Sequence, residues 1–424
     1  MSTAASDALS AALAASSGLA RLFAAAGHRL YLVGGVVREA VTGRFLDGAD
    51  LDCTTDARPP EVRRIVDGLA TSVWTQGERF GTIGCVVDGQ AFEITTHRAE
   101  RYDPHSRKPV VTFGEDVEQD LARRDFTVNA MAVDTAGGRL LDPHGGRQDL
   151  AARHLRTPLD PAISFGDDPL RMLRAARFIA SHGLVPDAAV VDAVREMGER
   201  LEIVAVERVR DELEKLLLLD DPSDGFGFLY RTGLIKRVLP DIAHHDPAET
   251  GRVAAAVAAE PAPRWASLFV RHATATVAAC LRGLRCSAAL VSAAAGLVEA
   301  RLELAGADCS QREVRRLVYR CPVPVDEALA FSRAAATALD EPVAGLDSFA
   351  ATLAELRRTE NVDRPELPLN GEEVMTALDL PPGPAVGDAL AFLRELTFEN
   401  GPLGKVEATD ALRRRRASDY CSEP

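Results

Sequence analysis

Two aspartates one residue apart are the feature of the sequence best suited to chemistry. Asp50 and Asp52 flank Leu51 at the start of a predicted strand, Leu51–Thr54. Side chains at positions i and i+2 of a strand project from the same face, so both carboxylates can reach one divalent cation or two cations close together. Magnesium takes one or two carboxylates together with phosphate oxygens of a substrate. The pair predicts a Mg²⁺ site, although an isolated pair of this kind is more often a polar turn.

A glycine turn lies shortly before the two aspartates. Gly34 and Gly35 follow the apolar run Leu30–Val33, and Arg38 stands in a predicted helix over Val36–Thr42. A glycine turn that enters a helix offers backbone N–H groups to a phosphate, and arginine binds phosphate in bidentate fashion. The turn matches neither the Walker A nor the G-x-G-x-x-G pattern. Together with the carboxylates it predicts nucleotidyl transfer, in which two metal ions activate a hydroxyl and stabilise the leaving pyrophosphate.

Two further groups add charged side chains. Glu93, in a predicted strand over Ala91–Thr95, is a candidate third carboxylate, and an ordinary hairpin residue is the alternative. Arg124 and Asp125 belong to the run Arg123–Ala130, before a predicted strand. They are candidates for binding phosphate and ribose, since a carboxylate accepts a hydrogen bond from the 2′-OH. A surface ion pair is the alternative interpretation.

A predicted helix near residue 168 carries charged residues every three positions. Asp168 is expected to cap it, with Pro169 in the first turn. Arg171, Arg174 and Arg177 then follow along one side and are expected to face a cleft or water. A solvated helix face is the alternative. The opposite side is expected to pack through three apolar residues, namely Leu170, Leu173 and Phe178.

The elements that position these groups predict an α+β fold, with a mixed sheet followed by helices. The first 140 or so residues combine strands and helices, and a hairpin is expected around Asp88-Gly89-Gln90. No convincing strand is predicted after residue 146. Further predicted elements of the first part are Asp7–Gly27, Pro59 to about Leu69, Ile83–Val87, Phe126–Val133 and Arg139–Leu141. The first helices of the second part are expected over Leu170–His182, Asp187–Met197, Val206–Leu219 and Gly225–Thr232.

Composition limits the classes of function. A formal charge of −14 over 424 residues argues against wide non-specific binding to nucleic acid, so any RNA contact must come from a local patch. The seven cysteines are dispersed without a C-x-x-C pair, which is typical of reduced thiols without zinc. We expect no signal peptide and no membrane span, and therefore a cytoplasmic protein. The run Arg413–Arg416 is expected to be a frayed helix end rather than a binding site.

Taken together, the motifs resemble the class II tRNA nucleotidyltransferases, the CCA-adding enzyme and bacterial poly(A) polymerase family of the polymerase-β superfamily. Across roughly residues 30–240 they follow the order of that family, and a weaker match covers Leu367–Gly404. Glu39 and Asp167 depart from the usual residues but keep a carboxylate. The matching segments are Val33–Arg38, Ala49–Thr55, Phe92–Arg98, Arg123–Ala130, Asp167–Phe178 and Glu207–Leu217.

The resemblance implies roles for individual residues. Asp50 and Asp52 would hold the catalytic Mg²⁺, with Glu93 as a further catalytic carboxylate. Asp168 and Arg171 would form a protein template for the base, since a carboxylate and a guanidinium match the amino group and ring nitrogen of cytosine and adenine. The residues implied in nucleotide binding are Gly34, Gly35, Arg38, Arg124, Asp125, Asp168, Arg171, Arg174 and Arg177.

The implied architecture is a polymerase-β-like catalytic head, residues 1–145, followed by an elongated all-α neck (146–240), body (241–360) and tail (361–424). The neck would carry the base template, the tail would contact tRNA, and His97–Phe113 would be a flexible loop that helps to switch from C to A addition. His244-His245-Asp246 with His272 is not expected to form a phosphohydrolase site.

The implied activity is template-independent addition of C and A to the 3′ end of tRNA from CTP and ATP. Addition of A alone and poly(A) synthesis are alternatives, and a non-catalytic RNA-binding protein is a less favoured one. The chain lacks the strongly basic C-terminal extension of the poly(A) polymerases, and its intact loop region disfavours an enzyme that adds only CC. The sequence leaves the oligomeric state open.

Overall fold

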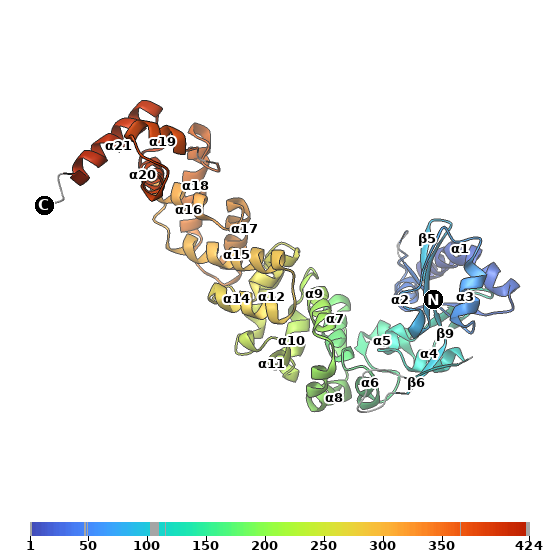
Figure 1. Ribbon diagram of the computed structural model, residues 1–424. Helices are drawn as coiled ribbons and strands as arrows, with labels where there is room; N and C mark the ends of the chain where they lie inside the picture. The colour runs from blue at the N-terminus through green and yellow to red at the C-terminus, as the bar shows by residue number, and fades with distance from the viewer. Residues whose placement is uncertain are drawn as a thin grey trace. The chain divides into compact units, whose positions relative to one another are not determined.

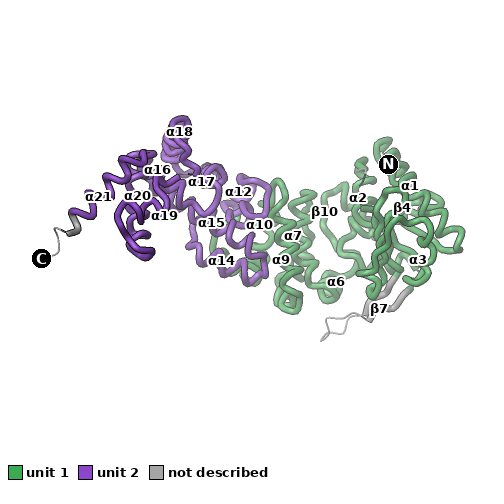
Figure 2. The backbone as a smooth tube through the Cα atoms, turned by 45° about the horizontal axis from the view of Figure 1, so that its top comes forward, with its two compact units in different colours: residues 1–247 green, residues 248–424 purple. Residues whose placement is uncertain are grey.

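The computed structural model describes residues 2–45, 48, 50–101, 110–114, 116–364 and 366–420. The chain forms two compact units, residues 1–247 and 248–424 (Figure 2). Each unit has its own buried core and is described by itself. The finer division into head, neck, body and tail stays a prediction.

A seven-stranded mixed sheet forms the centre of the first unit (Figure 1), in the order β3-β4-β5-β2-β1-β8-β9. β2 and β5 are parallel, and the other neighbouring strands are antiparallel. The predicted hairpin is confirmed, with positive φ angles at Asp88 and Gly89 in the turn between β4 and β5. The strands are β1 Leu30–Val33, β2 Leu51–Thr55, β3 Ser72–Trp74, β4 Thr82–Val87, β5 Gln90–Thr96, β8 Ala132–Asp134 and β9 Leu140–Leu141.

Three helices cover the apolar face of this sheet: α1 Thr3–Ala25, α2 Gly35–Val41 and α3 Pro59–Val66. Among the described helices, α1 is the one long and apolar enough to cross a membrane. Its residues Leu19 and Phe23 are fully buried in the core beneath the sheet. The apolar character of α1 is therefore that of a helix packed on a sheet.

The structure corrects the predicted strand Phe126–Val133. Thr127–Asn129 forms a 3₁₀ turn, η2, and only Ala132–Asp134 is a strand. The cause is local, because Asp125 Oδ1 accepts hydrogen bonds from the Phe126 backbone and the Asn129 side chain and bends the chain there.

The opposite face of the sheet, which carries Asp52 and Glu93, is called the site face below. The short helix α4, Val117–Ala122, covers its β1 and β8 side, where Val117 and Leu121 are buried against Tyr31, Val33 and Ala132. The remaining part of the site face lies over β5, β4 and β3.

The predicted flexible loop His97–Phe113 contains two strands, so its first and last parts are a hairpin rather than a loop. β6 Arg98–Arg101 pairs with β7 Val110–Phe113 as an antiparallel hairpin, and the intervening residues of the prediction lie outside the described part of the chain. His97 is buried at the base of this hairpin, where its Nδ1 lies 2.8 Å from Thr54 Oγ1.

Helices dominate the rest of the first unit, as predicted, but two features there differ from the predicted elements. Pro161–Asp167 forms an unpredicted helix, α6, and two-residue strands pair His154–Leu155 (β10) with Val185–Pro186 (β11). The other elements of this part are α5 Gly146–Ala152, α7 Arg171–His182, α8 Ala188–Met197, η3 Gly198–Ile203, α9 Val206–Leu217, α10 Ser223–Thr232 and α11 Ile235–Val238.

The second unit is helical throughout its described residues, with cores around Phe349 and around Leu393. Arg413–Arg416 lies inside the last helix, so the predicted fraying is wrong. Arg415 stacks 4.6 Å from the Phe392 ring centroid. The helices are α12 Pro247–Ala256, α13 Pro261–Ser267, α14 Thr274–Gly283, α15 Ala288–Gly306, α16 Gln311–Arg320, α17 Val325–Ala338, α18 Ala344–Thr359, α19 Gly371–Leu378, α20 Pro384–Asn400 and α21 Lys405–Tyr420.

Candidate functional site

Strand register brings the predicted carboxylates together. Asp52 on β2 is paired directly with Glu93 on the parallel strand β5. Directly paired residues point to the same face, and adjacent strands lie about 4.8 Å apart. Both side chains are exposed while their flanking residues are buried, and Asp50 immediately precedes β2. Three carboxylates therefore gather at one edge of the site face.

The electrostatics of Asp52 suit a bound cation. Asp52 keeps contact with solvent, but the protein atoms packed around its carboxylate exclude part of the surrounding water, and this desolvation raises its pKa. The nearby Arg124 opposes that effect, and the charges of Glu93 and Asp50 raise the pKa further. The three groups are hard oxygen donors whose mutual repulsion a divalent cation relieves, and such donors are the ligands that Mg²⁺ prefers. The residues present fit a magnesium site.

Gly34 is required beside these carboxylates. Its φ of +70° and ψ of −133° are disfavoured for other residues, and a Cβ there would lie 3.1 Å from Asp52 Oδ2 and 3.6 Å from Arg124 Nη1. The glycine turn thus lies close to the carboxylate of Asp52 on one side and to the guanidinium of Arg124 on the other. The helix α2 begins at the next residue, Gly35.

Arg124 is held in this position by a residue that the sequence did not single out. Asp120 is fully buried, and its carboxylate accepts from Arg123 at 2.6 Å and from Arg124 at 3.3 Å. Burial alone would raise the pKa of Asp120, but the two arginines lower it to about 2. The i,i+4 spacing of Asp120 and Arg124 was the available signal for this contact.

A second chain of hydrogen bonds links the glycine-turn helix α2 to α7. Arg38 donates to Asn129 Oδ1, and Asn129 Nδ2 donates to Asp125 Oδ1 at 2.9 Å. Arg174 donates to Asp125 Oδ2 from Nε at 2.9 Å and from Nη2 at 2.6 Å. Burial would raise the pKa of Asp125, but Arg174 and Asn129 hold it well below its usual range. Asp125 is therefore an ionised, fixed acceptor.

Phe178 was predicted on the apolar side of the helix, opposite the arginines, but it lies among them. Arg38, Arg174 and Arg177 lie with their guanidinium carbons 5.3, 5.7 and 4.8 Å from its ring centroid. Arg177 also pairs with Glu212 of α9, whose side chain is buried. The charged face of α7 is thus a packed layer of cation–π contacts and ion pairs rather than a free basic surface.

Asp168 and Arg171 are both anchored. Asp168 Oδ1 accepts from the Leu170 backbone at 3.1 Å, and Oδ2 accepts from Arg208 Nη2 at 3.0 Å. The capping contact is as expected, but α6 ends at the residue before Asp168 and α7 begins only at Arg171.

Arg171 is 8% exposed and donates to the groups that surround it. Its Nη1 bonds Ser164 Oγ at 2.8 Å, and its Nη2 bonds the Arg123 carbonyl at 2.6 Å. The guanidinium is thereby fixed between α6 and the end of α4.

One cavity of about 310 Å³ unites most of these groups. It brings the carboxylates of the sheet opposite the arginines of α7 and the anchored Asp168. The polar residues in its lining include Asp52, Glu93, Arg124, Asp125, Asp168, Arg171, Arg174 and Arg208. Among the described residues, the predicted site positions outside this lining are Asp50, Gly34, Gly35, Arg38 and Arg177.

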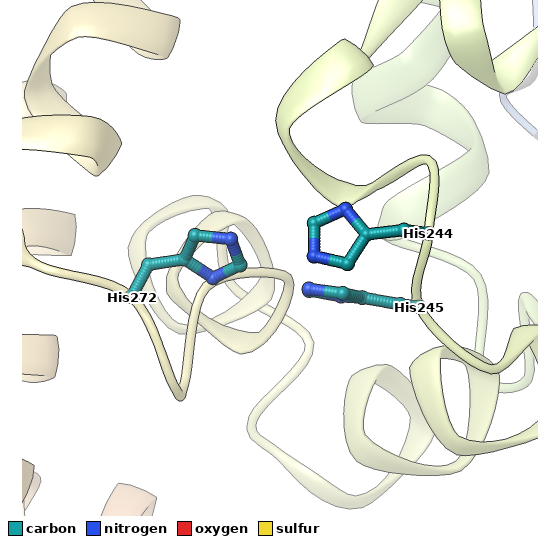
Figure 3. A group of neighbouring side chains, drawn as sticks. All are labelled: His244, His245 and His272. Carbon is teal, nitrogen blue, oxygen red and sulfur yellow. The ribbon is translucent and has the colours of Figure 1, made fainter.

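The histidines weighed for a phosphohydrolase site fall in different units. His244 and His245 end the first unit, with ring centroids 4.9 Å apart and nearly perpendicular (Figure 3). His272, also labelled there, belongs to the second unit and packs edge-on against Phe269 at 5.6 Å. The absence of that activity stays a prediction.

Comparison with known families supports this geometry. Residues 30–156 match the model of the poly A polymerase head domain, which contains the carboxylates and the glycine turn. Residues 183–245 match the model described as a probable RNA and SrmB-binding site of polymerase A.

Curated relatives agree with these matches. A CCA-adding enzyme of Geobacillus sp. (strain WCH70) is 39% identical over 209 residues, 49% of this chain and 50% of the relative. One of Anoxybacillus flavithermus is 38% identical over 218 residues, 51% of this chain and 53% of the relative. The matched segment thus spans about half the length of these relatives.

Solved structures extend the likeness over the whole chain. The Bacillus stearothermophilus CCA-adding enzyme in complex with CTP superposes with a TM-score of 0.75 and 26% identity, covering all of both chains. The Thermotoga maritima CCA-adding enzyme complexed with tRNA gives a TM-score of 0.65 at 19% identity, covering 94% of this chain and 93% of that one, and shows the fold. The chain thus contains a poly A polymerase head domain over residues 30–156, and over its whole length it has the fold of the CCA-adding enzymes, a polymerase-β-like head with a helical continuation.

Proposed function

We propose that the protein adds C and A to the 3′ end of tRNA from CTP and ATP, releasing pyrophosphate. One observation carries the proposal: a single cavity combines the carboxylates Asp52 and Glu93, the phosphate-compatible Arg124 and Arg174, and the Asp168–Arg171 pair. The names of the relatives support the same activity. As a tRNA-processing enzyme, the protein is proposed to work in the cytoplasm.

The carboxylates are assigned to metal binding. Asp50 and Asp52 would hold Mg²⁺, and Glu93, paired beside Asp52, would be a third ligand. Bound magnesium supplies activation of the RNA 3′-hydroxyl and stabilisation of the leaving pyrophosphate. The pKa of Asp52 is raised first by desolvation and then by the charges of Glu93 and Asp50, and a bound cation would relieve that charge repulsion.

The basic groups around the cavity are assigned to the triphosphate and ribose. The turn Gly34–Gly35, with Arg38, would receive phosphate oxygens, and Arg124 lies close to the same turn. Asp125, kept ionised by Arg174, would accept from a ribose hydroxyl in exchange for one of the hydrogen bonds that it now accepts from Phe126, Asn129 and Arg174. In-line transfer needs little beyond this positioning and charge stabilisation.

Asp168 and Arg171 are assigned to the base. Cytosine and adenine both present an amino donor beside a ring acceptor, whereas uracil and guanine would set a carbonyl oxygen against Asp168. Sites of this type discriminate by factors of about 10⁴. Since Arg208 already donates to Asp168, the base must use the remaining acceptor positions of that carboxylate.

The test is incorporation of radiolabelled CTP or ATP into three tRNAs that end before CCA, after C and after CC. CCA addition predicts C on the first two and A on the third, with no further extension. Growth on the CC end alone indicates an A-adding enzyme, and long A tails indicate a poly(A) polymerase. No incorporation on any end rejects the enzymatic proposal.

The Asp52→Ala variant tests the metal assignment. Loss of the carboxylate at the centre of the acidic cluster is expected to lower turnover by at least about 10³-fold, the scale of electrostatic stabilisation by one lost catalytic group. Binding of tRNA, measured by filter retention, is expected to change by less than about threefold. Turnover near that of the wild type would show that the metal lies elsewhere.

A further inference from the structure

A row of directly paired residues crosses the site face of the sheet. Asp52 is paired with Glu93, Glu93 with Gly84, and Gly84 with Trp74 on the edge strand β3. Because paired residues share a face, Trp74 points to the same side as the two carboxylates. A tryptophan thus stands at the end of the row that begins with the proposed metal ligands.

The indole reaches back toward the carboxylates. A Cβ placed on Gly84 would lie 1.9 Å from Trp74 Cε2 and 2.0 Å from its Nε1, so the indole occupies the space that a side chain at this position would take. Gly84 is the residue beside Glu93, and neighbouring strands are about 4.8 Å apart. One ring face is covered by the sheet, while the side chain as a whole remains 36% exposed.

The residues assigned to the triphosphate indicate from which side the RNA terminus would approach the site. Gly34, Arg38 and Arg124, assigned to the triphosphate, come from segments next to β1 and from the end of α4, which covers β1 and β8. In nucleotidyl transfer, the attacking and leaving oxygens lie roughly in line. With the leaving pyrophosphate on the β1 side, the attacking 3′-hydroxyl comes from the side of β5, β4 and β3, where Trp74 lies.

We propose that Trp74 is a stacking platform for the 3′-terminal base of the RNA acceptor. This inference rests on the proposed function and adds a binding site for the second substrate. The base stacks on the open face of the indole, which sets the terminal ribose beside Glu93.

The chemistry of the reaction explains why an aromatic ring suits this position. The terminal base of the RNA acceptor changes at each addition: it is first an unpaired purine or pyrimidine and then a cytosine. The incoming nucleotide, in contrast, must be selected by its base at every step. Stacking is tolerant of sequence because every base has a π-face. A ring therefore holds each successive end without the hydrogen-bond selection that Asp168 and Arg171 apply to the incoming base.

The first test is fluorescence. The chain has two tryptophans, and Trp265 is fully buried in the second unit, so the wild type minus a Trp74→Phe variant isolates the Trp74 signal. Adding tRNA that ends in CC is expected to quench that signal, and tRNA with an abasic terminal nucleotide is expected to quench it much less. Equal signals with the two RNAs would overturn the proposal.

The second test is kinetic. Trp74→Leu is expected to raise the KM for tRNA roughly 5- to 100-fold, the range for losing one stacked base, and to leave the KM for CTP within twofold. Trp74→Tyr restores a ring and is expected to recover most of the loss. The matched control is Val73→Ala, on the same strand but paired with the buried Cys85 on the other face, which is expected to leave both constants unchanged.

The two tests separate this inference from the proposed function. If the wild type incorporates CTP while Trp74→Leu keeps a normal KM for tRNA, the ring only covers Gly84 and the platform is refuted. If the wild type incorporates nothing on any tRNA end, the proposed function fails, and quenching by intact but not abasic tRNA still supports a base-stacking site at Trp74.

Discussion

Replacing Gly34 by alanine tests whether the glycine turn and the carboxylate act as one unit. The added methyl group would lie 3.1 Å from Asp52 Oδ2, closer than ordinary van der Waals contact, so the carboxylate must shift by a few tenths of an ångström. It also forces a side chain into a backbone conformation with φ of +70° and ψ of −133°. The substitution therefore has two effects, backbone strain and displacement of the proposed metal ligand.

The two effects have different expected sizes. Backbone strain at such a position costs about 1–3 kcal/mol of the free energy of unfolding. Displacement acts on catalysis, where a 1 Å error in position costs about 100-fold, so a shift of a few tenths of an ångström predicts a loss of roughly 3- to 10-fold in kcat. The same loss is expected with either CTP or ATP, because the base-reading residues are not touched.

Gly27 provides the matched control. Its φ is +80°, but nothing lies within 4 Å of the position that a Cβ would take. Gly27→Ala is thus expected to lose stability in urea denaturation with little change in kcat, while Gly34→Ala is expected to lose both. If Gly34→Ala retains a kcat within twofold of the Gly27→Ala value, the close approach of the turn to Asp52 has no catalytic meaning.

Two further predictions concern base choice and acid stability. Arg171→Ala is expected to raise misincorporation of UTP and GTP relative to CTP by at least about tenfold, a larger effect than its effect on triphosphate affinity. Unchanged selectivity among the four nucleotides would contradict the template assignment. The pKa of Asp120 is about 2 in the folded protein, against an ordinary value of 3.8. The difference corresponds to about 2 kcal/mol of stability above pH 4, and this contribution is lost as the pH falls from 4 toward 2. Asp120→Asn is expected to be less stable at pH 7 and to lose less stability between pH 5 and pH 3, and a pH dependence parallel to that of the wild type would contradict the ion pairs with Arg123 and Arg124.

Local patterns in the sequence predicted the parts of the site that depend on spacing within one segment. The i,i+2 pair Asp50 and Asp52, the glycine turn and the run from Asp168 to Arg177 could be recognised because each belongs to one strand, turn or helix. The α+β fold and the hairpin at Asp88-Gly89 followed from the same kind of pattern and are confirmed. Roles within the site remain proposals, since they depend on substrates.

Local patterns failed where a side chain competes with the backbone. Phe126–Val133 is rich in residues that favour strands, yet Asp125 accepts hydrogen bonds from the Phe126 backbone and from Asn129, and the chain turns there. Asn129 also accepts from Arg38, so the turn is part of the site's own hydrogen-bond network. The strand propensity of this run was overridden by these local hydrogen bonds of Asp125, and the contact of Asn129 with Arg38 adds a link that forms when α2 and η2 come together.

The residues that the sequence missed are those that strand register or helix packing brings to the site. Arg208 and Glu212 belong to the matching segment Glu207–Leu217, yet nothing in that segment indicates that the packing of α9 on α7 pairs them with Asp168 and Arg177. Trp74 depends on register most directly, because a slip of one residue between β3 and β4 would turn the indole to the opposite face. In the observed register, Gly84 leaves room for the indole beside Glu93, and any side chain there would displace it. The pairing of Trp74 with Gly84 thus determines whether the proposed acceptor side of the site has an aromatic surface. This pairing depends on the register of two strands and cannot be predicted from either strand alone.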